Sequence, residues 1–181
     1  MGTSTDSTLR RPPVDHRGVL IDAYDRIKET VHTTLDGLDR EALTYRIDPE
    51  ANTIAWLVWH LARVQDDHVA GVAGSEQVYT ADGWNARFAL PFDDDAIGYG
   101  QSTEDVSKVD VDAELLAGYV DAVHARTVEY LDTLTAEDLD RVIDENWDPP
   151  VTLAVRLVSV VSDDLQHIGQ AAFIRGVVER R

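Results

Sequence analysis

Apolar residues recur at intervals of three and four positions along most of this chain, which is the spacing of one face of an α-helix. The first stripe starts after Gly18 and runs over residues 20–38. A second follows Asn52, which is predicted as the N-cap, and should end near Gly71 or Gly74. These two segments predict two long amphipathic helices that each bury one face.

Two further helices are predicted in the second half of the chain. One begins near Asp110 to Asp112 and carries a stripe from Leu116 to Leu134. Asp148-Pro149-Pro150 then interrupts the chain before a last helix from about Val151 to Arg180. That helix is apolar nearly all round as far as Val161, so a central position is expected. With no internal repeat and no convincing strand alternation, an all-α four-helix bundle is the predicted fold.

The chain length fits one domain: 181 residues, of which 44% are hydrophobic. Residues 1–14 are rich in Thr, Ser and Pro and are predicted as a flexible N-terminal tail, leaving 15–181 for the bundle domain. A long irregular segment, Ser75 to Asp110, is expected between the second and third helices. Loops of this length in compact domains usually serve function. Substrate contacts are therefore expected there, and the residues predicted as a lid or wall are Trp84, Arg87, Phe92 and Tyr99.

Composition narrows the classes of function. The formal net charge of −18 argues against binding a nucleic-acid backbone or an anionic membrane, because both need clustered Lys and Arg. The chain has no cysteine, which excludes disulfides, thiolate metal ligands and a cysteine nucleophile. No apolar run reaches transmembrane length, and the N-terminus lacks an apolar signal core. The expectation is a cytoplasmic protein that acts on a small molecule.

The candidate chemistry lies on the second and last predicted helices. Asp163 and His167 are spaced i,i+4 and leave the same helical face, and His60 lies on the apolar second helix. Together they would form a set of two histidines and one carboxylate that binds a divalent metal with positions left open. Alternatively, Asp163 and His167 form a simple ion pair and His60 is a hydrogen-bonded core residue. Asp67 shares the face of His60 and is either a partner that orients an imidazole or a solvated acid.

These segments resemble the DinB-like superfamily, which includes thiol-dependent S-transferases and mycothiol-dependent maleylpyruvate isomerases. The resemblance rests on Ile54-Ala55-Trp56-Leu57-Val58-Trp59-His60-Leu61-Ala62 and on the closing Asp163-x-x-x-His167-x-Gly169-Gln170. It spans most of the chain, from about residue 18 to 180. In that family one histidine comes from the second helix and an H-x-x-x-H or E-x-x-x-H pair from the last. The resemblance therefore implies His60, Asp163 and His167 as metal ligands, with aspartate where His or Glu is more usual.

The resemblance also implies an activity. A bound zinc, nickel, iron or manganese ion would activate a low-molecular-weight thiol for S-transfer to, or isomerisation of, a small electrophile. From the residues themselves, Arg87 or Arg156 is expected to pair with a carboxylate of the thiol cofactor or substrate, with a structural salt bridge as the alternative role of Arg156. A homodimer is the expected assembly. Two alternatives stay open: a non-enzymatic bundle that has a degenerate site and binds a ligand or partner, and a metal-dependent hydrolase that uses activated water.

Overall fold

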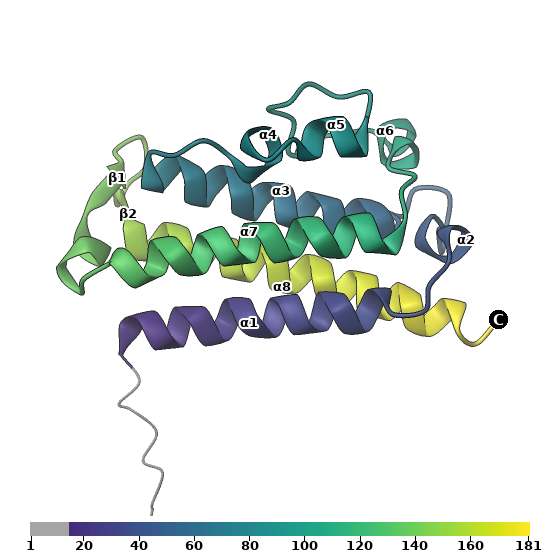
Figure 1. The fold of residues 1–181 in the computed structure, drawn as a ribbon, viewed down its shortest axis with the longest axis horizontal. Helices are drawn as coiled ribbons and strands as arrows, with labels where there is room; N and C mark the ends of the chain where they lie inside the picture. The colour runs from purple at the N-terminus through teal and green to yellow at the C-terminus, as the bar shows by residue number, and fades with distance from the viewer. Residues whose placement is uncertain (1–14) are drawn as a thin grey trace, which may run out of the picture.

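Four long helices that lie side by side dominate the computed structural model, which describes residues 15–181 (Figure 1). They are α1 (His16–Leu35), α3 (Ile54–Ala73), α7 (Ala113–Thr133) and α8 (Leu153–Val178). Helix α8 packs on α3 and α1, and α7 packs on the same two helices from the other side. The all-α four-helix bundle predicted from the apolar stripes is therefore confirmed. The predicted tail, residues 1–14, lies outside the described residues.

Side-chain caps set where the long helices begin. The side chains of Asp15, Thr53, Asp112 and Thr152 each accept a hydrogen bond from a backbone N–H in the first turn of the helix that follows. Thr53, not the predicted Asn52, caps α3. At its other end, α3 stops at Gly74, which adopts the left-handed conformation that glycine tolerates without strain (φ +68°).

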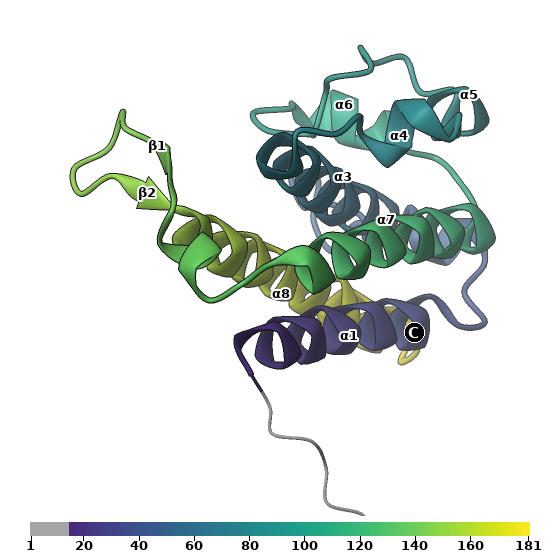
Figure 2. The ribbon, with the colours of Figure 1, turned by 60° about the vertical axis from the view of Figure 1, so that its left-hand side comes forward.

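The segment between α3 and α7 is more ordered than the predicted irregular loop. It forms three short helices, α4 (Val78–Ala81), α5 (Trp84–Phe88) and α6 (Thr103–Lys108). They lie over the outer side of α3 and α7 (Figure 2). Another one-turn helix, α2 (Arg40–Leu43), joins α1 to α3. Helices of four to six residues are too short to give a clear apolar period, which is why the sequence pattern missed them.

A small antiparallel hairpin precedes α8. A 3₁₀ turn (η1, Glu137–Asp140) leads into β1 (Val142–Asp144), which pairs with β2 (Val151–Thr152). The prediction of no strand was wrong here, because two or three residues are too few to show alternation. Helix α8 consequently begins at Leu153, two residues later than predicted.

The apolar cluster at the centre of the bundle includes Trp59, Leu57 and Leu61 of α3, which are at most 1% exposed. Helix α8 departs from its predicted central position on one face. Val155 and Val158 are 50% and 58% exposed, so the apolar stretch before Val161 is not wrapped on all sides. Among residues 15–181, no helix is both long and apolar enough to cross a membrane.

Candidate metal centre

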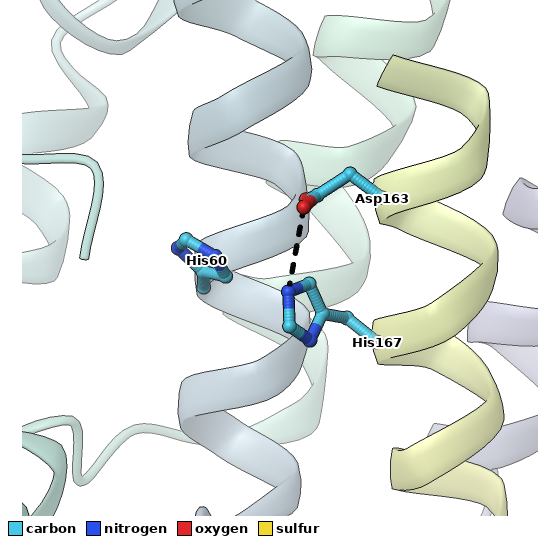
Figure 3. Close-up of side chains that lie close together, drawn as sticks. All are labelled: His60, Asp163 and His167. Carbon is cyan, nitrogen blue, oxygen red and sulfur yellow. Dashed lines mark ion pairs between the residues drawn. The ribbon is translucent and has the colours of Figure 1, made fainter. Parts of the chain in front are cut away.

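His60, Asp163 and His167 meet where α3 packs against α8. Figure 3 shows the two α8 side chains directed toward the His60 ring. One ligand atom from each residue lies within 4.8 Å of the others. His60 is buried at 6% exposure, whereas Asp163 and His167 are partly exposed and leave the group open on one side. The structure thus brings together the three residues that the sequence singled out from helices about a hundred positions apart.

The histidine rings are held in defined orientations. The imidazole of His60 stacks on Trp56, with ring centroids 4.6 Å apart, and meets the His167 ring edge to face at 4.8 Å. Nδ1 of His60 donates to the backbone carbonyl of Ile97. A carbonyl can only accept, so this bond places the proton on Nδ1 and leaves Nε2 as a free lone pair.

His167 has a matching arrangement on α8. Its Nδ1 lies 3.4 Å from Oε1 of Gln170, and its Nε2 lies 3.6 Å from a carboxylate oxygen of Asp163 (Figure 3). Gln170 is one turn further along α8, so the acceptor that orients this ring is supplied locally. Histidines that ligate metals almost always donate their second ring N–H in this way.

The electrostatics of the group favour a neutral imidazole at His60 and an ionised carboxylate at Asp163. Burial lowers the pKa of His60 below its usual value, which keeps the ring unprotonated near neutral pH. The contact with His167 lowers the pKa of Asp163, and the same contact raises the pKa of His167. Without a cation, the second carboxylate oxygen of Asp163 is buried and has no hydrogen-bond partner among the described residues. A divalent ion would satisfy that oxygen, so the donor set fits a metal.

A loop from α5 to α6 covers the His60 side of the group. Gly98 lies against the imidazole: a Cβ built there would lie 2.6 Å from Nδ1 of His60. Its φ of +95° also belongs to the region that favours glycine. The indole N–H of Trp56 donates to Gln101 at 2.7 Å, which fastens the same loop to α3.

Arg63 of α3 holds residues 94–96 of this loop in place. Its guanidinium is fully buried and donates to the carbonyls of Asp94 and Ala96 at 2.8 and 3.1 Å. It also forms an ion pair with the buried Asp66 at 3.6 Å. Sequence reasoning missed this arginine, although an arginine within an apolar helical stretch is a signal for a buried hydrogen-bond network.

The other predicted site residues are spread over the molecule. The guanidinium of Arg87 lies 3.7 Å above the Trp84 ring in the outer helix α5. Arg156 lies on α8, two turns before Asp163, and donates to Nδ1 of His68 at 3.2 Å. Asp67 contacts His68 and Gln77, so its predicted role beside the His60 ring falls instead to the Ile97 carbonyl.

The outer loop residues do not form a single wall. Trp84 is buried, Phe92 packs on Trp59 at a centroid distance of 5.6 Å, and Tyr99 is 92% exposed. The part of the predicted lid that reaches the candidate site is the backbone around Ile97 and Gly98.

Comparison of the sequence with known protein families identifies the family of this chain. The sequence model of mycothiol S-transferases matches residues 19–179. The chain belongs to the mycothiol S-transferase family. The match covers the bundle except the first three residues of α1, includes both helices that contribute to the candidate centre, and confirms the DinB-like resemblance.

A solved structure shares the fold. The crystal structure of a conserved protein from Enterococcus faecalis superposes with a TM-score of 0.86 at 33% sequence identity. The alignment covers 92% of this chain and 99% of that one. No curated protein matches significantly.

Proposed function

We propose that this protein is a metal-dependent S-transferase that joins a mycothiol-like thiol to a small electrophile. The observation that carries the proposal is the convergence of His60, Asp163 and His167 in a chain of the mycothiol S-transferase family. Two neutral imidazoles and one carboxylate suit zinc, nickel, iron or manganese. Three protein ligands leave coordination positions for a substrate.

A divalent ion supplies a Lewis acid that lowers the pKa of a nearby thiol toward neutrality. The chain itself orients the ligands: Ile97 and Gln170 hold the two imidazoles, and Trp56 excludes water from one face of His60. In the transfer, the thiol releases its proton to solvent and its sulfur forms a bond to the electrophilic carbon. The leaving group departs with the electron pair of the bond that breaks. The absence of cysteine agrees with a nucleophile that comes from a small molecule.

An apolar pocket beside Asp163 is the proposed position of the electrophile. It has a volume of about 570 Å³ and lies on the open face of α8, where Val155, Val158 and Ser162 line it. Apolar walls next to one charged group are typical of sites for small organic substrates. Val155 and Val158, which are exposed although α8 was predicted to be central, would then contact the substrate.

The test measures metal and thiol dependence together. Untagged protein is analysed for metal by mass spectrometry, and S-conjugation of a small electrophile is followed with and without mycothiol. We expect about one transition-metal ion per chain, lost in His60→Ala and in His167→Ala, and activity only with both metal and thiol. His32→Ala is the matched control, because His32 is exposed and pairs with Asp121.

Other outcomes contradict the proposal in distinct ways. Turnover of the substrate with metal but without thiol would indicate a hydrolase. A metal-free protein that takes up no zinc, nickel or manganese would indicate a degenerate, non-enzymatic site. Full metal content in His60→Ala would show that the three residues are not the ligand set.

A further inference from the structure

The β1–β2 hairpin lies at the end of the bundle where α8 begins (Figures 1 and 2). A polar pocket is lined by residues of this hairpin, of α3 and of α8. We call it the hairpin pocket. It has a volume of about 650 Å³. The side chains that give it its polar character come from α3, the hairpin and α8: Asp67, His68, Arg141, Asp144, Asn146 and Arg156.

The charges of the hairpin pocket balance. Two guanidinium groups, of Arg141 and Arg156, face two carboxylates, of Asp67 and Asp144. His68 accepts from Arg156 through Nδ1, so its Nε2 carries the proton and is a further donor. A pocket with several donors and several acceptors but no net charge is suited to a ligand with many hydroxyl groups. A simple anion is a poorer fit, because the carboxylates of Asp67 and Asp144 would repel it.

These groups are held in place before any ligand binds. Arg156 lies 3.7 Å from Asp144, and the Asn146 amide donates to the other oxygen of Asp144 at 2.8 Å. Arg141 is anchored by Val72 and Tyr130 at 3.3 Å each. Fixed polar side chains lose little conformational entropy on binding, which favours recognition of a polar ligand.

An exposed tryptophan stands at the same hairpin. Trp147 follows Asn146 in the chain and is 66% exposed. Its indole is close enough to Asp144 to help lower the pKa of that carboxyl, after the larger effects of Asn146 and Arg156. An exposed indole beside donors and acceptors suits a sugar ring, whose faces are apolar C–H surfaces and whose edges are hydroxyls.

The hairpin pocket is connected to the metal centre along one face of α8. Arg156 precedes Asp163 by seven residues, which is two turns or about 10 Å along the helix axis. His68, on the facing helix, contacts Arg156 and is near enough to Asp163 for that carboxylate to act on the pKa of the imidazole. A ligand bound in the pocket therefore needs a body about 10 Å long to place its reactive atom at the centre.

We propose that the hairpin pocket binds the uncharged, hydroxyl-rich body of the thiol, between Arg156 and Trp147, and directs its sulfur toward His60, Asp163 and His167. This rests on the proposed function, since it assigns one end of the thiol substrate of the same site. The electrophile then occupies the apolar pocket beside Asp163, which borders the same stretch of α8. Of the two arginines predicted to hold the thiol, the proposal gives the role to Arg156 only.

Binding is measured by calorimetry with S-methyl mycothiol, which retains the sugar-like body but has no thiol and cannot react. We expect saturable binding to wild type, weakened at least tenfold in Arg156→Gln and in Trp147→Ala. Arg126→Gln, at a partly exposed arginine paired with Glu129 on α7, should bind as wild type does. Metal content should be unchanged in all three variants. In turnover assays, Arg156→Gln should raise the KM for the thiol and leave the KM for the electrophile unchanged.

Three results would overturn the proposal. They are no binding to wild type, unchanged affinity in both Arg156→Gln and Trp147→Ala, and tighter binding of S-methyl glutathione, which carries two carboxylates. Failure of the proposed function looks different. If S-methyl mycothiol binds in a way that depends on Arg156 and Trp147 but no thiol is transferred, the pocket assignment stands and the S-transferase proposal falls.

Discussion

Nδ1 of His60 donates a hydrogen bond to the backbone carbonyl of Ile97, which lies 37 residues further along the chain. The bond fixes the tautomer of the imidazole, so that Nε2 is free toward Asp163 and His167. It also makes the outer loop part of the candidate centre, although that loop contributes no ligand. The geometry of the centre consequently depends on residues that touch His60 from outside the α3–α8 pair.

Gly98→Ala should weaken metal binding. The added Cβ would lie 2.6 Å from Nδ1 of His60, so either the ring or the loop has to move and the bond to Ile97 is lost. Loss of such an outer contact typically costs about 10- to 100-fold in metal affinity. Competition titration with a chromophoric zinc chelator measures the effect.

Gly100→Ala is the matched control. Gly100 has a similar positive φ, +73°, but a Cβ there meets nothing within 4 Å. Both variants carry a comparable backbone strain, and only Gly98→Ala disturbs the imidazole. Equal zinc affinities of the two variants would refute a role of the loop in orienting His60.

Two substitutions of Asp163 should separate the effect of its negative charge on metal affinity from the effect of its side-chain length. Asp163→Asn keeps the shape of the side chain but removes the anionic ligand, so metal affinity should fall by more than the roughly 100-fold that an outer contact costs. Asp163→Glu keeps the carboxylate on a longer side chain and should retain at least one tenth of the wild-type affinity. Zinc titrations of both variants test this, and an Asn variant that binds zinc as tightly as wild type would exclude Asp163 as a ligand.

Arg63→Met should destabilise the fold. The substitution leaves the buried Asp66 without its ion-pair partner and frees the carbonyls of Asp94 and Ala96. Removing one partner of a buried pair costs about 3–5 kcal/mol of the free energy of unfolding. Urea denaturation of the metal-free protein measures the loss. Arg126→Met, at a surface ion pair with Glu129, should change the free energy of unfolding by less than about 0.5 kcal/mol. A similarly small loss for Arg63→Met would contradict the expectation.

Asp164 should make the stability of the metal-free protein depend on pH. Its carboxyl is fully buried and has no hydrogen-bond partner among the described residues. Burial, and then the charge of Asp163, raises its pKa well above the usual range. The folded protein keeps this proton above pH 4, where the unfolded chain has lost it. The contribution of Asp164 to stability therefore falls as pH rises toward the folded-state pKa, by up to about 1.4 kcal/mol per pH unit.

The measurement is urea denaturation at several pH values between 4 and 7. Asp164→Leu and Asp164→Asn both remove the titrating group, and the Asn variant adds no volume. Each variant should gain stability relative to wild type as pH rises. A difference between wild type and variants that stays constant over this range would show that Asp164 ionises normally in the folded protein.

The sequence by itself determined the four long helices and the shared face of Asp163 and His167. Both follow from the local period of the α-helix, which requires no knowledge of what the helix packs against. The family resemblance was also carried by short segments, around His60 and His167, and the match over residues 19–179 confirms it. The short helices and the hairpin could not be predicted from the sequence, because each contains too few residues to show a period.

The tertiary structure decided which side chains meet. Asp163 and Asp164 are neighbours in sequence, yet one faces the metal centre and the other lies near Tyr24 of α1 inside the bundle. Neighbouring helical residues point about 100° apart, so only the positions of α1 and α3 around α8 assign their environments. The same holds for the Ile97 carbonyl and for the hairpin pocket. A backbone oxygen carries no residue type, and the pocket draws its side chains from three segments that only the fold brings together.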